Sequence, residues 1–282
     1  MRFKKKVKFN DKTLRKEYLA FLSPLSLLLS FLSIAIDIPD KYKWVAFMSI
    51  IILFIILYIS FWVKANLQER TELTINNSTV EIKVGDIFTE PELKVIAFNE
   101  YFDTQVDNKI ISESSLNGIY IKNKIQDVAE LDRKMEQDDH LNSEDIKIGR
   151  NENRRQGKKD KYKLGTIFQH DDFLLTAFSK FDSKNRAHLH MNDYVNFLMN
   201  FWNEVDIVYN GRSISIPLLG TGITRFKGYD MITEQELLEL LIWSFKITKI
   251  KFNYPSAVTI VIHDSLKDKI DFYKLKELAN GI

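Results

Sequence analysis

The chain has 282 residues, with 40 Lys and Arg against 38 Asp and Glu, and it has no cysteine. A formal charge of +2 excludes a nucleic-acid binder that works by bulk charge, so no nucleic-acid partner is expected. The lack of Cys excludes a disulfide scaffold, a thiolate zinc site, an iron–sulfur cluster and a cysteine nucleophile. Long apolar runs gather in the first quarter, and the residues after position 70 suffice for one domain with a sizeable core.

Two uncharged apolar runs predict transmembrane helices at 18–36 and 44–63. A helix of about 20 residues crosses a hydrocarbon core of about 30 Å. Two buried helices of a soluble core are one alternative, but such helices rarely run this long without a polar face. A cleaved signal peptide is another, and residues 37–43 offer no small-residue cleavage site. We therefore assign 1–70 to a membrane anchor and 71–282 to a second domain.

The charges around the spans predict their orientation. Residues 1–17 carry eight Lys and Arg against two acids, the connector 37–43 has two of each sign, and Lys64 and Arg70 follow the second span. The positive-inside rule places both termini and the second domain in the cytoplasm. The spans contain no charged residue, so an ion or proton relay has no candidate. A protein with so short a connector would breach a membrane by assembling, not as a monomeric channel.

Alternating strand and helix patterns predict an α/β domain after residue 70. The expected strands are 79–84, 93–98, 164–169, 173–178, 213–219 and 257–262, and the expected helices are 191–203, one from about 233, and about 271–279. Thr233 and Glu236 form a capping box at the start of the second helix. This alternation indicates a mixed or mainly parallel sheet with helices packed on it.

A charged insertion at about 122–163 interrupts the pattern. It holds twelve basic and ten acidic residues, with Leu131, Met135 and Leu141 scattered among them. We expect a solvated helix or a mobile segment here, not core. Its basic cluster is expected on a solvated face, with contact to anionic lipid as the alternative. The cluster contains Arg154, Arg155, Lys158 and Lys159.

The segment PLLGTGITRF at 217–226 is the leading candidate for a ligand-binding loop. A predicted strand runs into Gly220 and Gly222, and glycines let backbone N–H groups approach a phosphate closely. A plain turn between strand and helix is the alternative. A G-x-G-x-x-G fingerprint is excluded because Arg225 occupies the third glycine position, and a Walker A loop is absent.

Catalytic and metal-binding motifs are weak or missing. The sequence has no G-x-S-x-G elbow and no His–Glu helix motif. A zinc site would need His188 and His190 to converge with a third ligand, for which His170, Asp171 and Asp172 are the upstream candidates. We therefore expect no catalytic residue, no metal ion and no resident cofactor.

The order of several motifs resembles a macro domain. VGDIF at 84–88 and IPLLGTGITRF at 216–226 are similar to the I-x-x-GDIT motif and the P-x-x-G-x-G-x-x-x-F loop typical of that family. The strings at 95–107, 114–120 and 171–182, joined to two amino-terminal spans, resemble the membrane-anchored macro-domain effectors of type II Thoeris anti-phage defence systems. The resemblance covers nearly the whole chain. It implies a three-layer α/β/α macro fold with a mixed sheet, anchored in a bacterial inner membrane.

The resemblance also implies the residues that bind an ADP-ribose-type nucleotide. Asp86 would accept a hydrogen bond from the adenine amine, with the backbone of Ile87 beside it. Phe226 would pack against the distal ribose, and Asn117 and Gly118 stand where the first phosphate loop is expected. The main-chain N–H groups that would wrap the diphosphate are those of Gly220, Thr221, Gly222, Ile223 and Thr224.

Two departures from the family pattern count against ADP-ribosyl hydrolysis. Residues 114–118 read Ser-Ser-Leu-Asn-Gly where hydrolytic macro domains carry a run of glycines, and Arg225 replaces a common glycine. Arg225 is instead a candidate to contact a carboxylate or phosphate of a ligand larger than ADP-ribose. A surface salt bridge is the alternative for this side chain.

The function implied by the resemblance is that of a signal receptor and effector, not an enzyme. A TIR-domain partner would consume NAD and make an ADP-ribose-type messenger, expected to be histidine–ADP-ribose. Binding would favour homo-oligomerisation of the spans in membrane lipid, membrane disruption and abortive infection. A membrane-tethered ADP-ribosyl hydrolase is the first alternative, and an inert scaffold without a ligand is the second.

Overall fold

The computed structural model describes residues 5–36, 38–229, 231–253 and 255–276. The chain forms two units. One unit contains the residues up to Glu69 together with Asp271–Lys276, and the other contains Arg70–Ile270. The first unit therefore takes a short segment from the far end of the sequence.

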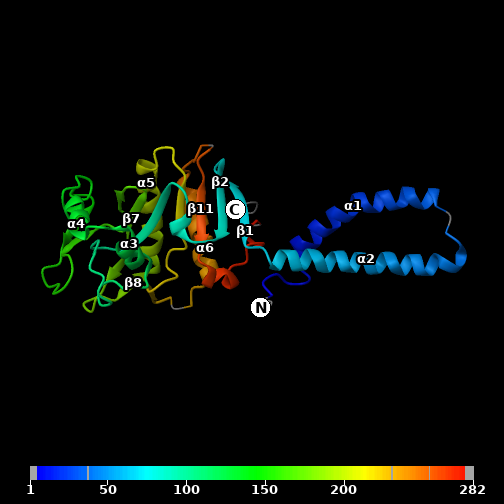
Figure 1. Ribbon diagram of the computed structural model, residues 1–282, viewed down its shortest axis with the longest axis horizontal. Coiled ribbons are helices and arrows are strands. Elements are labelled where there is room, and N and C mark those ends of the chain that lie inside the picture. Colours follow the sequence, from blue (N-terminus) through cyan, green and yellow to red (C-terminus); the bar gives the residue numbers. More distant parts are fainter. Residues whose placement is uncertain (1–4, 37, 230, 254, 277–282) are drawn as a thin grey trace. The chain divides into compact units, whose positions relative to one another are not determined.

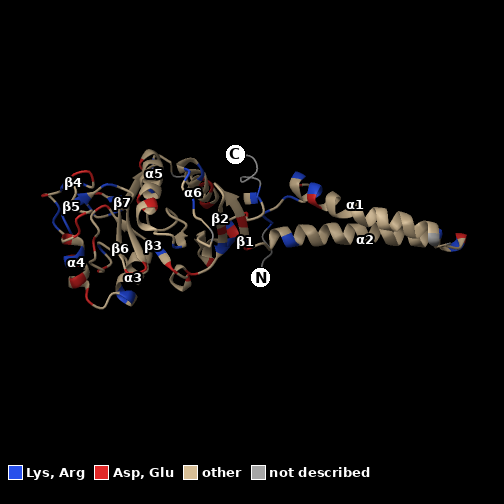
Figure 2. Ribbon diagram, turned by 90° about the horizontal axis from the view of Figure 1, so that it is seen from above, with Lys and Arg blue, Asp and Glu red and all other residues tan. Residues whose placement is uncertain are grey.

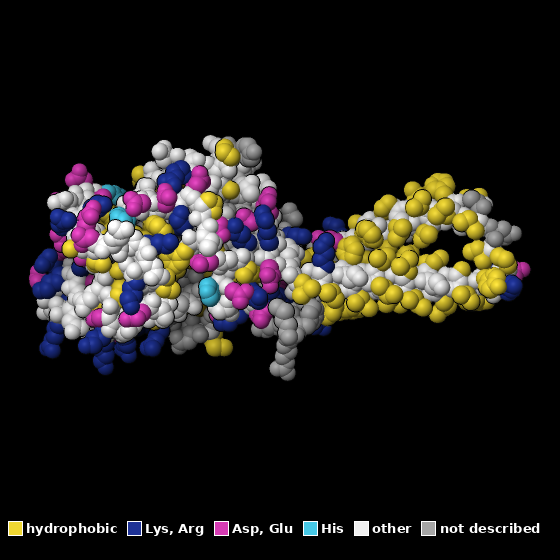
Figure 3. Space-filling view, viewed as in Figure 1, with side chains coloured by type: hydrophobic (Ala, Val, Ile, Leu, Met, Phe, Trp, Pro, Cys, Tyr) yellow, Lys and Arg dark blue, Asp and Glu magenta, His cyan; other side chains and the backbone are white. Residues whose placement is uncertain are grey.

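Two long helices, α1 (Lys12–Ala35) and α2 (Asp40–Asn66), form a hairpin in the first unit (Figure 1). Both are long and apolar enough to cross a membrane. Hydrophobic side chains cover the outside of the hairpin in Figure 3, unlike the buried helices of a soluble core. The two helices predicted at 18–36 and 44–63 are thus confirmed, and each begins a few residues earlier than its apolar run.

The start of α1 shows why that helix begins early. The carboxylate of Asp11 accepts hydrogen bonds from the backbone N–H groups of Thr13 and Leu14, each at 3.0 Å. Such a cap satisfies donors that the first turn of a helix leaves unpaired. Residues 12–17, most of them polar, therefore extend the helix beyond the apolar run by more than a turn.

Polar and aromatic side chains stabilise the base of the hairpin, which is the end where the chain enters α1 and leaves α2. The buried Asn66 accepts hydrogen bonds from the backbone N–H groups of Lys6 at 2.7 Å and Val7 at 2.9 Å. The indole of Trp62 donates to the Val7 carbonyl at 2.9 Å. This base also contains a buried apolar cluster of Val7, Leu14, Ala65 and Tyr273.

A mixed sheet runs through the second unit, with strand order β1-β2-β11-β9-β3-β7-β8-β10 and with β6 also paired to β7. All neighbours from β2 to β7 in this order are parallel, whereas β1, β6 and β8 pair antiparallel with β2 or β7. The strands of the sheet are β1 (Arg70–Ile75), β2 (Ser78–Val84), β3 (Leu93–Asn99), β6 (Ile167–His170), β7 (Phe173–Phe181), β8 (Ala187–His190), β9 (Ile214–Pro217), β10 (Arg225–Lys227) and β11 (Val258–Ile262).

Helices cover both faces of this sheet. Figure 2 shows α5 (Met191–Val208) and α6 (Glu234–Thr248) on one side and α3 (Leu116–Lys124) on the other. The central strands are apolar because both faces are covered. The predicted capping box opens α6: Thr233 Oγ1 accepts from the N–H of Glu236 at 3.2 Å, and the Glu236 carboxylate accepts from the N–H of Thr233 at 2.7 Å. The expected three-layer α/β/α fold is confirmed.

The expectation that the insertion at 122–163 contributes nothing to the core is wrong. The segment forms α4 (Val128–Glu136) and a two-stranded sheet of β4 (Lys147–Arg150) and β5 (Asp160–Tyr162). Leu131, Met135 and Leu141 are at most 2% exposed and belong to the same hydrophobic core as β3 and β7. Leu131 and Met135 stand four residues apart and share one face of α4, a pattern that the count of charges concealed.

Other boundaries also differ from the prediction. The strand expected at 164–169 is the shorter β6. The sequence patterns did not predict β1, β8, β10 or α3. The helix expected at about 271–279 is described only to Lys276. Residues 272–274 form a turn, Leu275 and Lys276 are helical, and the rest of the prediction lies outside the described residues.

Candidate functional site

A cavity of about 590 Å³ lies at the carboxyl ends of the central strands. Its walls come from the residues that follow β2, β11, β9 and β3 and from the end of β7. Parallel strands bring their carboxyl ends to one edge of a sheet, where α/β proteins bind ligands. Loops at 108–117, 185–187 and 217–225 complete the lining.

Asp86 and Ile87 line this cavity directly after β2. Asp86 Oδ1 accepts a hydrogen bond from the N–H of Phe88 at 3.0 Å and so begins the short helix η1 (Ile87–Thr89). The side chain is exposed, and its second oxygen, Oδ2, has no hydrogen-bond partner among the described residues. Asp86 is therefore a turn residue that still has an acceptor facing outward.

The loop before α3 presents hydroxyl and amide groups to the cavity. Ser115 caps the helix, because its Oγ accepts from the N–H of Gly118 at 3.3 Å and donates to Asn117 Oδ1 at 2.6 Å. Asp107 fixes the other end of the loop, because its Oδ1 accepts hydrogen bonds from the N–H groups of Ile110 and Lys109. These hydrogen bonds keep the pKa of Asp107 below its ordinary value. The polar residues of the lining here are Asn108, Ser112, Ser114, Ser115 and Asn117.

Gly118 does not line the cavity. A Cβ at this position would lie 2.1 Å from the Ser112 carbonyl oxygen, so only glycine allows α3 to start so close to the loop. The N–H group of Gly118 already donates a hydrogen bond to Ser115 Oγ. A contact between Gly118 and phosphate stays a prediction, and the close packing is the role that the structure displays.

The glycine loop at 217–225 forms another wall. Gly222 is exposed, and a Cβ on it would meet no atom within 4 Å, so its backbone is open to the cavity. Thr221 stabilises the loop because its Oγ1 donates to the Leu218 carbonyl at 2.9 Å. The lining also includes Gly220, Ile223, Thr224 and Arg225.

Phe226 lies behind this loop and not in the cavity wall. Its side chain is 6% exposed, and its ring packs edge-on against Tyr194 with a centroid distance of 5.4 Å. Gly220 has a φ of +94°, and a Cβ there would approach the Phe226 ring to 3.0 Å. The turn therefore requires glycine at 220, and Phe226 supports it. Contact between Phe226 and a ribose stays a prediction.

Charged side chains give the lining a positive balance. Lys109, Arg186 and Arg225 line the cavity, against the single acid Asp86. Arg186 is paired with Asp182 at 2.7 Å. Arg225 is exposed and has no ion pair or hydrogen bond to a side chain among the described residues. An unpaired guanidinium beside a basic cavity favours an anionic ligand.

Several residues that line the cavity were not predicted as site residues from the sequence. Asn99 ends β3, Phe181 ends β7, and Asn185 and Arg186 lie in the turn that follows. For Asn99 a signal existed, because a polar residue directly after a buried parallel strand lies at the edge where ligands bind. The turn after β7 carries no motif that would have marked it.

The order of strands gives the length of the cavity. β2, which leads to Asp86, and β3, which ends at Asn99, are separated by β11 and β9. Neighbouring strands lie about 4.8 Å apart, so β2 and β3 are about 14 Å apart across the sheet. The site is thus elongated along the strand order and suits an extended ligand.

The histidine pair does not form a metal site with other described residues. The rings of His188 and His190 have centroids 6.4 Å apart. Within the part of the chain that the structure describes, no three His, Asp or Glu side chains converge in a way that would hold a metal ion.

Comparison with known proteins assigns the fold to a family. Residues 80–263 match the family model of the Thoeris protein ThsA, macro domain. The chain is 40% identical over 277 residues to the Thoeris protein ThsA of Bacillus amyloliquefaciens (strain Y2). The matched region covers 96% of this chain and 92% of that protein. The chain belongs to the Thoeris ThsA family. The predicted resemblance is therefore confirmed, and with it a macro domain and a general role in Thoeris defence.

Solved structures of macrodomains are more distant. The Oceanobacillus iheyensis macrodomain with ADP is 15% identical, covers 76% of this chain and 98% of that chain, and has a TM-score of 0.48. The same macrodomain with MES bound is 16% identical with a TM-score of 0.46, at the same coverage of both chains.

Proposed function

We propose that this cavity binds an ADP-ribose-type messenger and that the chain is the membrane-anchored receptor and effector of its defence system. The open backbone at Gly222, in a cavity with a positive lining, is the observation that supports this most directly. An anionic diphosphate needs close N–H donors and few competing acids, and an exposed glycine loop with a single acid in the lining supports this proposal.

The proposed placement of the ligand follows the two ends of the cavity. The free Oδ2 of Asp86 accepts a hydrogen bond from the adenine amine, since a carboxylate is acceptor-only when ionised. The diphosphate lies between the glycine loop and the polar loop of Ser115 and Asn117. The distal ribose then reaches the amides of Asn99 and Asn185, at the end of the cavity beyond β3 and away from the adenine end.

The proposed messenger is histidine–ADP-ribose, made by a TIR-domain enzyme that consumes NAD. Arg225 supports a ligand with an additional anionic group, because its guanidinium lines the cavity without a partner among the described side chains. A carboxylate on the conjugated group would pair with it in a bidentate arrangement.

Activation is proposed to act through the hairpin of α1 and α2. The messenger must bind the assembled state more tightly than the resting state, because a ligand with equal affinity for both shifts no equilibrium. Assembly of several hairpins then disrupts the membrane. The proposal therefore predicts that leakage of vesicles depends on ligand binding.

Calorimetry on the full chain in nanodiscs tests the binding site, with NAD, ADP-ribose and histidine–ADP-ribose as probes. Asp86→Asn keeps an oxygen for the Phe88 N–H but replaces the outward acceptor with an amide. We therefore expect weaker binding without loss of the turn. Asp206→Asn is the matched control, because Asp206 is exposed and lies outside the cavity.

Three results would change this proposal. A folded wild-type chain that binds none of the three probes would leave the glycine loop as a plain turn. Release of ADP-ribose from a modified protein would favour the hydrolase. Vesicle leakage that is the same with and without messenger, or unchanged in Gly222→Glu, would contradict the effector step.

A further inference from the structure

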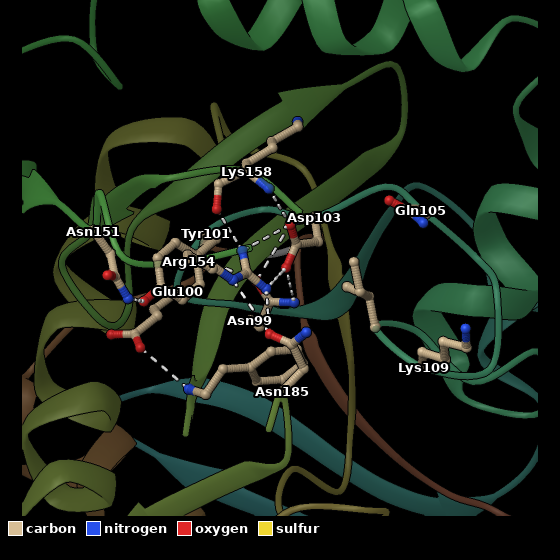
Figure 4. A network of polar contacts seen from close by, with 12 residues as sticks. Asn99, Glu100, Tyr101, Asp103, Gln105, Lys109, Asn151, Arg154, Lys158 and Asn185 are labelled. Atoms are coloured by element: carbon tan, nitrogen blue, oxygen red, sulfur yellow. Dashed lines mark hydrogen bonds and ion pairs between the residues drawn. The ribbon is translucent and has the colours of Figure 1, made fainter. Parts of the chain in front are cut away.

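A buried ion pair connects the charged insertion to the loop that follows β3. Arg154 Nη2 lies 2.6 Å from Asp103 Oδ2, Nη1 lies 3.0 Å from Oδ1, and the two side chains are 5% and 1% exposed (Figure 4). Asp103 also accepts from the N–H of Lys158 at 2.7 Å and from Asn99 Nδ2 at 3.0 Å. The carboxylate is thus fully occupied, which a buried charge requires.

The guanidinium of Arg154 is fixed on its remaining sides as well. It lies over the Tyr101 ring at 3.9 Å from the centroid, and Nη1 also donates to the Lys158 carbonyl. Its Nε and Nη2 donate to Asn185 Oδ1 at 3.3 and 3.1 Å. Figure 4 shows Asn99 and Asn185 on the same side of this pair.

The ion pair therefore holds two amides that line the cavity, Asn99 and Asn185. Because a guanidinium only donates, it fixes Oδ1 of Asn185 toward itself and leaves the amide N–H groups as the outward donors. Asn99 is held through the carboxylate instead: Oδ1 accepts from the N–H of Tyr101 at 2.9 Å, and one N–H of Nδ2 donates to Asp103. Each amide keeps an N–H group for a ligand.

We propose that Arg154 is a positioning residue for the end of the cavity away from Asp86. The insertion, through this side chain, sets the orientation of the two amide donors that meet the distal part of an ADP-ribose-type ligand. This inference rests on the proposed function for the identity of the ligand. The placement of Asn99 and Asn185 does not depend on it.

The variant Arg154→Lys tests this role in the full chain in nanodiscs. Lysine keeps the charge beside Asp103 but lacks the planar fork that reaches Asp103 and Asn185 together. We expect the affinity for ADP-ribose to fall about tenfold, the effect of one misplaced hydrogen-bond partner, while the affinity for AMP stays within about twofold. Arg155→Lys is the matched control, because Arg155 is the exposed neighbour outside the cavity.

Two further measurements separate positioning from general stability. Asn185→Ala leaves the buried ion pair and Asn99 in place and should cost no more affinity than Arg154→Lys. The double variant should cost no more than Arg154→Lys alone. Hydrogen exchange of residues 182–186 in ligand-free Arg154→Lys should accelerate, because the Asn185 N–H bond to the Asp182 carbonyl loses its support.

The outcomes distinguish this inference from the proposed function. Wild-type affinity for ADP-ribose in Arg154→Lys, an equal loss for AMP, or additive losses in the double variant would each overturn the positioning role. A wild-type chain that binds neither ADP-ribose nor AMP would refute the proposed function. Unchanged exchange at 182–186 in that case would refute the positioning of Asn185 as well.

Discussion

The phenol of Tyr273 donates a hydrogen bond to Glu17 Oε2 at 2.9 Å, although 256 positions separate the two residues. Tyr273 is 5% exposed and packs with Val7, Leu14 and Ala65 at the base of the hairpin. The first unit is therefore built from three stretches of chain: the two helices with the residues before them, and Asp271–Lys276.

Removing this contact should loosen the base of the hairpin. Tyr273→Phe loses one hydrogen bond to a carboxylate, and we expect a cost of about 1 kcal/mol. Tyr273→Ala also loses the buried ring, and we expect a total of about 3 kcal/mol. The measurement is the rate of tryptic cleavage after Lys274 in detergent, which should rise in that order. Tyr229→Phe, an exposed tyrosine of the other unit, is the control and should leave the rate unchanged.

The two glycines of the binding loop should respond oppositely to substitution. Gly222→Glu meets no atom near its Cβ, so the thermal midpoint should stay close to that of the wild type while ADP-ribose binding is lost. Gly220→Ala forces a positive φ on alanine and brings its Cβ to 3.0 Å from the Phe226 ring. We expect a stability loss of about 1–2 kcal/mol or more. Equal thermal midpoints for the two variants would contradict this account of the loop.

Arg225 should discriminate between messengers. Arg225→Met removes a charge that has no side-chain partner among the described residues, so the fold should keep its stability. We expect the affinity for histidine–ADP-ribose to fall about tenfold or more and that for plain ADP-ribose to change less. Lys227→Met, two residues along β10 and outside the cavity lining, is the control. An equal loss for both ligands would place Arg225 at the diphosphate instead.

Asp182 should make the turn beside the cavity sensitive to acid. The backbone N–H of Arg186, together with the Arg186 side chain and the N–H of Lys184, holds the pKa of Asp182 well below its ordinary range. Its stabilising contribution is then fully present above the unfolded pKa of about 3.9 and is lost as the pH falls through the lower, folded value. Asp182→Asn should therefore speed hydrogen exchange at 182–186 at pH 7.

The size of that effect should depend on pH in a defined direction. The difference in protection, corrected for intrinsic exchange, between Asp182→Asn and the wild type should stay constant from pH 7 to about 5 and shrink below about pH 4. Asp206→Asn should show no difference at any pH. A difference that grows as the pH is lowered would mean that the carboxylate opposes the turn.

The elements that the sequence predicted correctly are those whose signal is local. The apolar runs of α1 and α2, the capping box of Thr233 and Glu236, and the glycine pair of the loop each lie within a short window. Propensity, capping and backbone freedom act over a few residues, so such windows contain the whole cause.

The rest depends on partners that are distant in the chain. Arg154 looks like part of a solvated basic cluster, yet Asp103, 51 positions earlier, makes it a buried residue. Asn185 lies in an unremarkable turn and lines the cavity only because that guanidinium orients it. Leu131 and Met135 lie in a segment rich in charged residues, and both are buried. One apolar helical face is enough to place such a segment in the core, and a count of charges over the whole segment does not detect that face.

The third stretch of the first unit has a consequence for the order of biosynthesis. Residues 271–276 leave the ribosome after the whole of 70–270, whereas α1 and α2 emerge first. Throughout translation the site that receives Tyr273 at Glu17 and Ala65 stays vacant. A chain released before residue 271 would therefore have both helices but an incomplete base. The base of the hairpin can be completed only after the macro domain has been fully synthesised.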